Sequence, residues 1–347
     1  MNDKAILLLR ADASPQIGTG HVMRCLALAQ AWRERGGIPV FAAATLGSAL
    51  AKRLAKEELE LVSLAASPGS AEDATQTAML ARARNACWAV VDGYQFNDAY
   101  QKVIKQSDLR LLFVDDNGHA KHYCADIILN QNFHATEALY ANRAPYTRLL
   151  VGVSYALLRR EFWSCRDRPR EFPGQSRRLL VTLGGSDPDN VTLTVVKAVT
   201  MLALPDLKVR IVVGPANSNL ASIREGIEGT NDSFELFTDV EDMHALMSWA
   251  DASVNAGGTT CWELLAMGIP MVVIIVADNQ RKIAESLAEN GIACCVGWHG
   301  ELTPTDLARK LGELLESSAL RSQMISRGRR LVDGLGARRV VDQLWKV

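Results

Sequence analysis

A histidine follows a glycine-rich loop near the start of this chain. The segment Arg10–Arg24, RADASPQIGTGHVMR, comes after a short apolar run typical of a buried parallel strand, and a helical pattern begins near its end. Gly18 and Gly20 let the backbone approach a ligand closely. His21 falls on the first turn of the helix, where the partial positive charge of the helix N-terminus disfavours a protonated imidazole. A neutral histidine facing a ligand can accept a proton, so we predict that His21 is a general base.

Three loops in the second half of the chain each follow a predicted strand and lead into a helix. Their sequences are GGSD at 184–187, AGGT at 256–259 and ADNQ at 277–280, and Asp189 or Asn190 is expected to cap the helix after the first loop. Glycine amides and helix N-termini at the carboxyl ends of parallel strands form a site suited to phosphate. The residues expected to contact the ligand are Gly185, Ser186, Gly257, Gly258, Thr259, Asn279 and Gln280.

Glu263 lies one turn into the helix that follows the second of these loops. Thr260 and Glu263 have the spacing of a capping box, in which the carboxylate binds only the start of its own helix. The same carboxylate would also be suited to accept both hydroxyls of a nucleotide ribose. The residues alone support both interpretations equally.

Four other polar residues have a simpler interpretation than metal binding. Asp115 and Asp116 end a predicted strand, where capping or hydrogen bonding is the more common role. His119 and His122 lie in the following loop without a third clear metal ligand. We therefore expect no metal site.

Strand and helix patterns alternate along the whole chain, which predicts an α/β fold of two doubly wound parallel sheets facing a crevice. Domain 1–158 is predicted to hold the catalytic glycine loop, 159–177 to be the connection, and 178–330 to be the nucleotide-binding domain. The last stretch, 318–347, is expected to be helical and is rich in arginine, and its end, 331–347, is expected to cross back to the first domain as a helix. The predicted strands are 5–10, 38–44, 59–64, 88–92, 109–115, 127–130, 179–183, 209–213, 234–238, 252–255 and 271–276. The helices singled out in the second half are 191–204, 259–267 and 280–289.

Composition narrows the class of protein further. The chain has 347 residues, 48% hydrophobic and 22% charged, with a net charge of −1, so no electrostatic feature indicates nucleic acid or a membrane surface. Its seven cysteines fit neither a disulfide framework nor a zinc motif. No signal-peptide pattern and no membrane-spanning run is seen, so we expect a soluble, cytoplasmic protein that is a monomer or a weak homo-oligomer.

Two common nucleotide-binding motifs are missing. The segment Gly18–Met23 lacks the third glycine of a dinucleotide fingerprint, and the second predicted strand ends at Ala43–Thr45 without an acidic residue for a ribose. No G-x-x-x-x-G-K-[ST] sequence occurs either. A nicotinamide enzyme and a P-loop nucleotidase are therefore not expected.

A family resemblance runs through the chain. The segments RADASPQIGTGHVMRCLALA, VVDGY, FVDD, YALLRREF, LGGSDPDN, NAGGTTCWELLAMGIP and ADNQ occur in this order. Together they resemble the UDP-sugar hydrolases of pseudaminic acid biosynthesis, which release UDP from UDP-2,4-diacetamido-2,4,6-trideoxy-β-L-altropyranose and are related to the MurG glycosyltransferases of two-domain GT-B fold.

The resemblance implies a role for each matching residue. His21 corresponds to the general base, Tyr94 and Asn279 to substrate-contacting residues, and Glu263 to the ribose-binding glutamate. Gly18, Gly20 and Arg24 lie in the first motif and are expected to contact the substrate. The implied reaction is hydrolysis at the anomeric C–O bond with inversion, without a metal or other cofactor. A MurG-like transferase and a non-catalytic nucleotide-sugar binding protein remain as alternatives.

Overall fold

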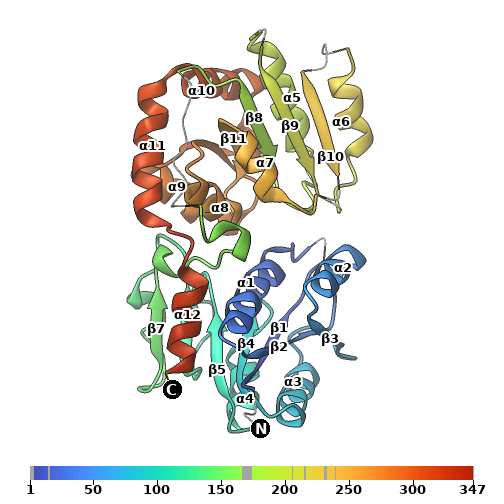
Figure 1. Cartoon of the computed structure of the whole chain (residues 1–347), viewed down its shortest axis with the longest axis vertical. Helices are drawn as coiled ribbons and strands as arrows, with labels where there is room; N and C mark the ends of the chain where they lie inside the picture. The colour runs from blue at the N-terminus through green and yellow to red at the C-terminus, as the bar shows by residue number, and fades with distance from the viewer. Residues whose placement is uncertain are drawn as a thin grey trace. The chain divides into compact units, whose positions relative to one another are not determined.

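The computed structural model describes residues 4–14, 16–165, 174–204, 206–214, 216–229, 233–238 and 240–346. They form two compact units, Met1–Trp163 with Leu335–Val347, and Ser164–Gly334 (Figure 1). The change from the first unit to the second falls within the expected connection 159–177, of which residues 166–173 lie outside the described residues. Each unit is described separately below.

The first unit contains a seven-stranded parallel sheet with strand order β3-β2-β1-β4-β5-β6-β7. The strands are β1 Ile6–Ala11, β2 Ile38–Ala43, β3 Glu60–Ser63, β4 Ala86–Asp92, β5 Arg110–Val114, β6 Ile127–Asn130 and β7 Arg148–Val151. The helices are α1 Gly20–Glu34, α2 Ser48–Lys56, α3 Ala71–Ala83, α4 Asp98–Lys105 and α12 Gly336–Trp345, with short 3-10 turns at Glu137–Tyr140, Val153–Tyr155 and Arg160–Phe162.

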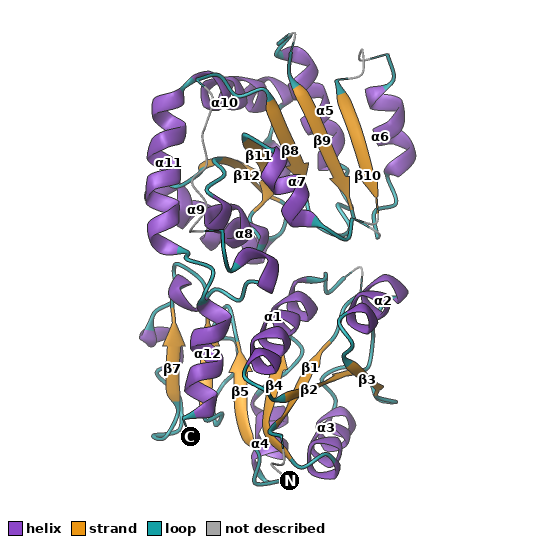
Figure 2. Ribbon diagram, viewed as in Figure 1, coloured by secondary structure: helices purple, strands orange, loops and turns teal. Residues whose placement is uncertain are grey.

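Alternating side chains of the central strands build a core on each face of this sheet. Leu7 and Leu9 of β1 pack into a cluster with α1 and α12, whereas Leu8 packs into a second cluster with α3 and α4. Because both faces are covered, the inner strands are mostly apolar, which is why they were recognisable in the sequence. Figure 2 shows the helices flanking the strands.

Helix α12 belongs to the first unit although it lies at the other end of the sequence. Trp88 of β4 donates its indole N–H to the carbonyl of Leu344 at 3.0 Å. The rings of Trp32 and Trp345 lie 4.5 Å apart between their centroids. The expected helical stretch at the end of the chain is interrupted, because α11 ends at Leu331 and α12 begins at Gly336.

The second unit repeats the same topology with six parallel strands in the order β10-β9-β8-β11-β12-β13. The strands are β8 Arg178–Thr182, β9 Lys208–Val213, β10 Phe234–Thr238, β11 Ala252–Ala256, β12 Met271–Ile275 and β13 Cys294–Trp298. The helices are α5 Val191–Met201, α6 Leu220–Ile227, α7 Met243–Trp249, α8 Thr260–Met267, α9 Arg281–Glu289, α10 Pro304–Glu316 and α11 Ser318–Leu331, with 3-10 turns at Asp278–Gln280 and His299–Glu301.

In each unit the chain adds strands first on one side of its starting strand and then on the other side. This change of side falls between β1 and β4 in the first unit and between β8 and β11 in the second. Loops that leave the carboxyl ends of such neighbouring strands diverge to opposite faces and leave room for a ligand. The prediction of two doubly wound parallel sheets is therefore confirmed, and each sheet has a defined edge where a ligand would bind.

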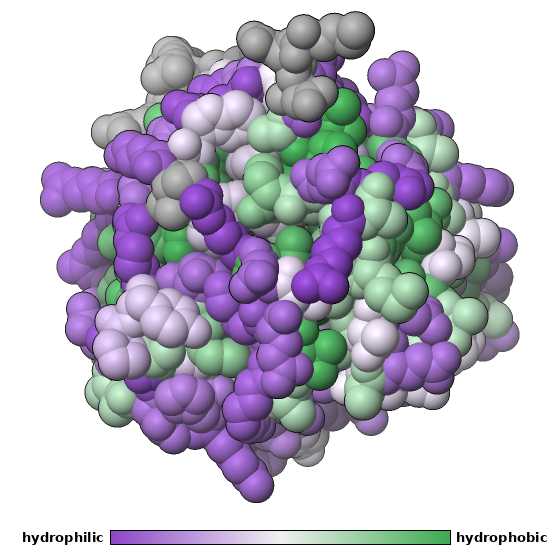
Figure 3. All heavy atoms as spheres, turned by 90° about the horizontal axis from the view of Figure 1, so that it is seen from below, coloured by the Kyte–Doolittle hydropathy of each residue, from purple (hydrophilic) through white to green (hydrophobic). Residues whose placement is uncertain are grey.

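Two surface observations complete the fold. None of the helices in the described residues has the length and apolar composition that crossing a bilayer requires. On the face of the molecule drawn in Figure 3, hydrophilic and hydrophobic residues are interspersed.

Candidate active site

The glycine loop after β1 leads directly into α1. Gly18 has a φ of +78°, a left-handed conformation that favours glycine, and its N–H donates to the carbonyl of Ser14 at 2.8 Å. Pro15 of this loop lies outside the described residues. Thr19 occupies the N-cap without a side-chain cap bond, and Gly20 and His21 begin the helix. The predicted position of His21 on the first turn is confirmed.

Asp92, the last residue of β4, binds the His21 ring. Its Oδ1 lies 2.6 Å from Nδ1 of His21, and both side chains are buried. An ionised carboxylate can only accept, so Nδ1 carries the hydrogen and, in the neutral ring, the lone pair lies on Nε2. Asp92 therefore selects the tautomer and orients the ring, the arrangement that makes a histidine an effective base.

Arg24 lies between two buried carboxylates. Its Nε and Nη2 donate to Asp92 at 2.9 and 2.6 Å, and its Nη1 donates to both oxygens of Asp116 at 2.8 and 2.9 Å. Nη2 also lies 2.9 Å from Nδ1 of His21, because both groups donate to the same Asp92 oxygen. The structure thus gives Arg24 a role in positioning these side chains and does not support the expected substrate contact, since its guanidinium is occupied and only 4% exposed.

Asp116 binds side chains from three parts of the first unit. Besides Arg24, it accepts from the hydroxyl of Tyr94 at 2.9 Å and from the amide of Asn132 at 2.7 Å. Burial alone would raise the pKa of Asp116, but the charge and hydrogen bonds of Arg24, together with Tyr94, lower it to about 2. The same carboxylates raise the pKa of Arg24 well above its ordinary value against the effect of burial. Asp116 and Arg24 therefore form a buried ion pair.

Tyr94 is the exposed member of the group. Its ring packs edge-on against His21, with centroids 4.8 Å apart and planes at 86°, and 40% of the residue is exposed. The structure brings together five predicted residues of the first unit, namely Gly18, Gly20, His21, Arg24 and Tyr94, at the edge where β1 and β4 pair through Ala11 and Asp92.

The loop after β5 provides a second polar cluster beside Tyr94. Asp115 accepts from the backbone N–H groups of Asn117 and Gly118 at 2.6 and 2.9 Å, and from the Tyr123 hydroxyl. His119 lies against the same carboxylate, with Nδ1 at 3.3 Å from Oδ2. Hydrogen bonding at the strand end, as predicted, is confirmed for Asp115. The described residues hold no group of three acidic, histidine or cysteine side chains suited to a metal.

In the second unit, the loop after β8 is shaped by residues in the left-handed region. Gly184 has a φ of +93° and Asp187 a φ of +40°. A Cβ on Gly214, in the loop after β9, would lie 2.4 Å from the Cα of Gly185, so these two loops pack backbone to backbone. Gly185 and Ser186 are half-buried beside this contact.

The cap of α5 differs from the expectation. Asn190 occupies the N-cap in a left-handed conformation and makes no side-chain cap bond, and Asp189 makes none to the helix either. Instead Asp187 accepts from the backbone N–H groups of Val191 and Thr192 at 2.8 and 3.0 Å. The prediction of Asp189 or Asn190 was wrong because the left-handed backbone at 190 turns an earlier carboxylate toward the helix start.

The loops after β11 and β12 lie against one another. A Cβ on Gly257 would lie 3.1 Å from the carbonyl oxygen of Gln280, which is closer than a side chain tolerates easily. Oε1 of Gln280 accepts from the N–H of Val276 at 3.2 Å, so this side chain holds its own loop. Asn279 is exposed in the same 3-10 turn, and Gly258 is half-buried in the neighbouring loop.

The capping-box interpretation of Glu263 is not supported. Helix α8 begins at Thr260 with Thr259 at the N-cap, and no side-chain cap bond is formed there. Thr260 therefore lies inside the helix rather than before it, which removes one partner of the box. Gly268 ends the helix with a φ of +67°, as expected for a C-cap glycine.

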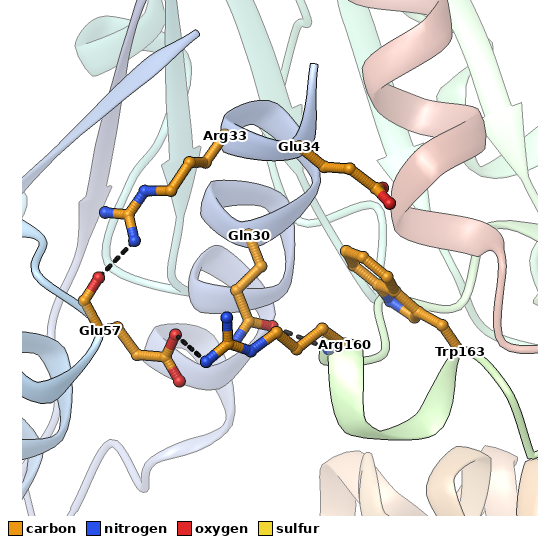
Figure 4. A pocket seen from close by; sticks show the side chains of 6 residues that line it. All are labelled: Gln30, Arg33, Glu34, Glu57, Arg160 and Trp163. Carbon is orange, nitrogen blue, oxygen red and sulfur yellow. Dashed lines mark hydrogen bonds and ion pairs between the residues drawn. The ribbon is translucent and has the colours of Figure 1, made fainter. Parts of the chain in front are cut away.

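A pocket in the first unit lies away from His21, at the other end of α1 (Figure 4). Its lining residues are Gln30, Arg33, Glu34, Glu57, Arg160 and Trp163. The Arg160 backbone N–H donates to Gln30 at 2.8 Å, and its guanidinium lies 3.4 Å from Glu57. Because these polar groups bind each other, the pocket is a packed connection of the loop at 160–163 to α1 rather than the candidate site.

Asp92 and Asp116 are the site residues that sequence reasoning missed. Asp92 stood in the quoted VVDGY motif without a role, and Asp116 was assigned only a local one. The signal was an acidic residue at the end of a fully apolar strand, since in a doubly wound sheet such a strand can lie beside the first one.

The fold and the site define a protein of the GT-B class, with two Rossmann-like parallel-sheet units and a buried histidine–carboxylate pair after the first strand. MurG of Acinetobacter baumannii has the same fold, with a TM-score of 0.68 at 16% identity over 99% of this chain and 100% of that one. Residues 179–334 match the glycosyltransferase family 28 C-terminal domain.

Two relatives are similar in sequence over much of the chain. The spore coat polysaccharide biosynthesis protein SpsG of Bacillus subtilis is 30% identical over 245 residues, which are 69% of this chain and 70% of SpsG. The UDP-2,4-diacetamido-2,4,6-trideoxy-beta-L-altropyranose hydrolase of Campylobacter jejuni is 27% identical over 288 residues, 82% of this chain and 97% of the hydrolase. The chain belongs to the family of SpsG, among the MurG-related GT-B proteins.

Proposed function

We propose that this protein hydrolyses a UDP-linked diacetamido-trideoxy sugar at the anomeric C–O bond with inversion. His21 accepts a proton from water through Nε2, the water oxygen attacks the anomeric carbon, and the bond from that carbon to the diphosphate oxygen breaks. UDP leaves with the bonding electron pair, and the free sugar keeps the water oxygen. Because UDP is already a good leaving group, no second carboxylate is needed as a general acid.

The observation that carries this proposal is the hydrogen bond between Asp92 and His21. This bond leaves the lone pair of His21 on Nε2. The carboxylate of Asp92 then stabilises the imidazolium that forms during proton transfer. The pair lies at the β1–β4 edge, the usual position of a ligand in such a sheet. Tyr94, packed on the imidazole and partly exposed, is proposed to contact the sugar.

The second unit is proposed to bind UDP. The loops 184–186 and 257–259 present glycine amides and a helix N-terminus where β8 and β11 end, which suits a diphosphate. Glu263, on the first turns of α8, is proposed to accept the ribose hydroxyls. These groups would also stabilise the charge that develops on the leaving diphosphate.

The relatives are compatible with both hydrolysis and glycosyl transfer. The hydrolase from Campylobacter jejuni is matched over 97% of its length and 82% of this chain. The match to the family 28 C-terminal domain covers residues 179–334, the part of the chain that we propose binds the nucleotide. That match supports a glycosyltransferase as the second candidate, with an acceptor hydroxyl in place of water.

Incubation with UDP-diacetamido sugars in ¹⁸O-labelled water, without any acceptor, tests the proposal. We expect rapid UDP release, the label at C1 of the free sugar, and by NMR a first-formed anomer opposite to that of the substrate. Label in the phosphate would show P–O cleavage and contradict the mechanism. Release only after an acceptor is added would indicate a transferase, and UDP-sugar binding without release would indicate a binding protein.

A further inference from the structure

We propose that His119 is a positioning residue for Tyr94, which holds the loop after β4 in place only while the imidazole is protonated. The inference rests on the proposed function, because Tyr94 matters through its contact with the sugar beside His21. Neither the sequence motifs nor the relatives' names assign a role to His119.

Both ring nitrogens of His119 face oxygen atoms that can only accept. Nε2 lies 2.8 Å from the carbonyl oxygen of Phe96, and Nδ1 lies 3.3 Å from Oδ2 of Asp115. Only an imidazolium carries hydrogens on both nitrogens and satisfies both oxygens at once. A neutral ring must give up one of the two bonds. Because the ionised carboxylate of Asp115 is a stronger acceptor than a carbonyl, we expect the bond to Phe96 to be the one released.

The bond to Phe96 connects the loop after β5 to the loop that carries Tyr94. The Tyr94 ring lies edge-on to both imidazoles, 4.8 Å from His21 at 86° and 6.4 Å from His119 at 90° between centroids. Its hydroxyl donates to Asp116 at 2.9 Å. Gln95 of the same loop donates to Asp12 at 2.9 Å through an amide, a donor that does not titrate. His119 is thus the titratable anchor of this loop.

The groups around His119 favour the charged ring. Asp115 lies against it, with the Tyr123 hydroxyl on the same carboxylate, and Asp116 adds a second negative charge. The remaining neighbours are the rings of Phe113 and Tyr94, and the Tyr140 hydroxyl lies 3.5 Å from the Asp115 carbonyl. Burial alone would lower the pKa of His119, but the bond and charge of Asp115 and the Phe96 carbonyl outweigh it and raise the pKa.

A raised pKa fixes the direction of the pH effect. The anchor is complete at low pH and is lost as the pH rises through the raised pKa of His119. We expect the KM for the sugar nucleotide to rise about tenfold over that range, which is the usual contribution of a hydrogen bond to a charged group.

The test compares His119→Gln with His119→Phe and with the matched control His122→Gln. Glutamine keeps one donor for Phe96 without titrating, and phenylalanine keeps the ring without a donor. His122 lies in the same loop and is half-buried, with Nδ1 2.9 Å from Oδ1 of Asn142. KM and kcat are measured from about pH 5.5 to about pH 8.5, around the range in which histidine titrates. Amide hydrogen exchange of Gly93–Phe96 is measured in parallel on the free protein.

The proposal expects a pH-dependent KM in the wild type and in His122→Gln, a pH-independent KM in His119→Gln, and a raised KM in His119→Phe. Exchange at Gly93–Phe96 should be faster in His119→Phe than in the control at equal pH. An unchanged pH profile of KM in His119→Gln, or unchanged exchange in a folded His119→Phe, would overturn it. Because exchange needs no substrate, it still decides the role of His119 if the proposed hydrolysis itself fails.

Discussion

Asp92 and His21 lie 71 positions apart in the sequence, and their side chains meet at 2.6 Å in the buried edge between β4 and α1. The same Asp92 oxygen accepts from Nη2 of Arg24, also at 2.6 Å. One carboxylate therefore holds a base in a defined tautomer while an arginine balances its charge.

Replacing His21 with asparagine removes the proposed base. We expect His21→Asn to lower kcat about 10²- to 10⁴-fold, the usual contribution of a general base, with little change in UDP affinity. Single-turnover kinetics and UDP titration calorimetry measure the two effects. His122→Asn serves as the control, because that ring binds Asn142 and, among the described residues, has no hydrogen bond to Asp92 or His21. Near wild-type turnover in a folded His21→Asn protein would remove His21 from the mechanism.

Asp92→Asn tests the orienting bond. The amide can donate to Nδ1 and so favours the tautomer in which Nε2 carries the hydrogen, which cannot accept a proton. We expect kcat to fall about 10²- to 10⁴-fold with UDP affinity retained, and the protein to lose about 3 kcal/mol or more of stability because Arg24 loses a buried partner. Asp126→Asn, which removes the Lys105 ion pair elsewhere in this unit, is the control. Unchanged kcat would show that the pair is only structural.

The fold was predictable where strands are buried on both faces. Strands such as β2 and β12 are apolar from end to end, because helices cover both sides of each sheet. The strands that sequence reasoning missed, β7 and β13, are the last in their sheets. Their residues are largely half-exposed, so Arg148–Val151 and Cys294–Trp298 carry too weak an apolar pattern to be recognised.

The site was predictable only in its local parts. The position of His21 after a glycine loop follows from neighbouring residues, so the sequence pattern was enough. Its bond to Asp92 depends on β4 lying beside β1, a long-range pairing that no local pattern contains. Arg24 was expected to face the substrate for the same reason, since the carboxylates that bind it come from two later strands.

Asp116 gives the protein a defined response to acid. Its pKa is lowered to about 2, so its contribution to stability is present above the ordinary value of 3.8 and is lost as the pH falls through about 2. The shift corresponds to about 2 kcal/mol. Urea unfolding followed from about pH 6 to about pH 2 should show a steeper loss in the wild type than in Asp116→Asn. Equal slopes in the two proteins would contradict an ionised Asp116 held by Arg24.

Glu263→Gln separates nucleotide binding from helix stability. The amide keeps the size of the side chain but weakens its charge-assisted bonds to the ribose hydroxyls. We expect UDP to bind about tenfold more weakly with a nearly unchanged melting temperature, because glutamine keeps the size and hydrogen-bonding capacity of the side chain. Glu289→Gln, at the other end of the following helix α9, is a matched control. A lower melting temperature with intact UDP affinity would assign Glu263 to the helix instead.

Hydrogen exchange can assign the nucleotide and the sugar to different loops. If 184–186 and 257–259 bind the diphosphate, UDP alone should protect their amides. The loop Gly18–His21 should gain protection mainly when a complete UDP-sugar, or a slowly hydrolysed analogue, is bound. The His21→Asn variant allows this measurement with the authentic substrate, because it binds UDP but turns over slowly.

The opposite pattern would change the mechanism rather than its details. Strong protection of Gly18–His21 by UDP alone would mean that the first glycine loop binds phosphate, as helix N-termini often do. His21 would then be a phosphate contact rather than a general base, and Asp92 would only orient its ring. The wild type with uridine as ligand provides the control, since it lacks the phosphates and should leave Gly18–His21 unprotected in either case.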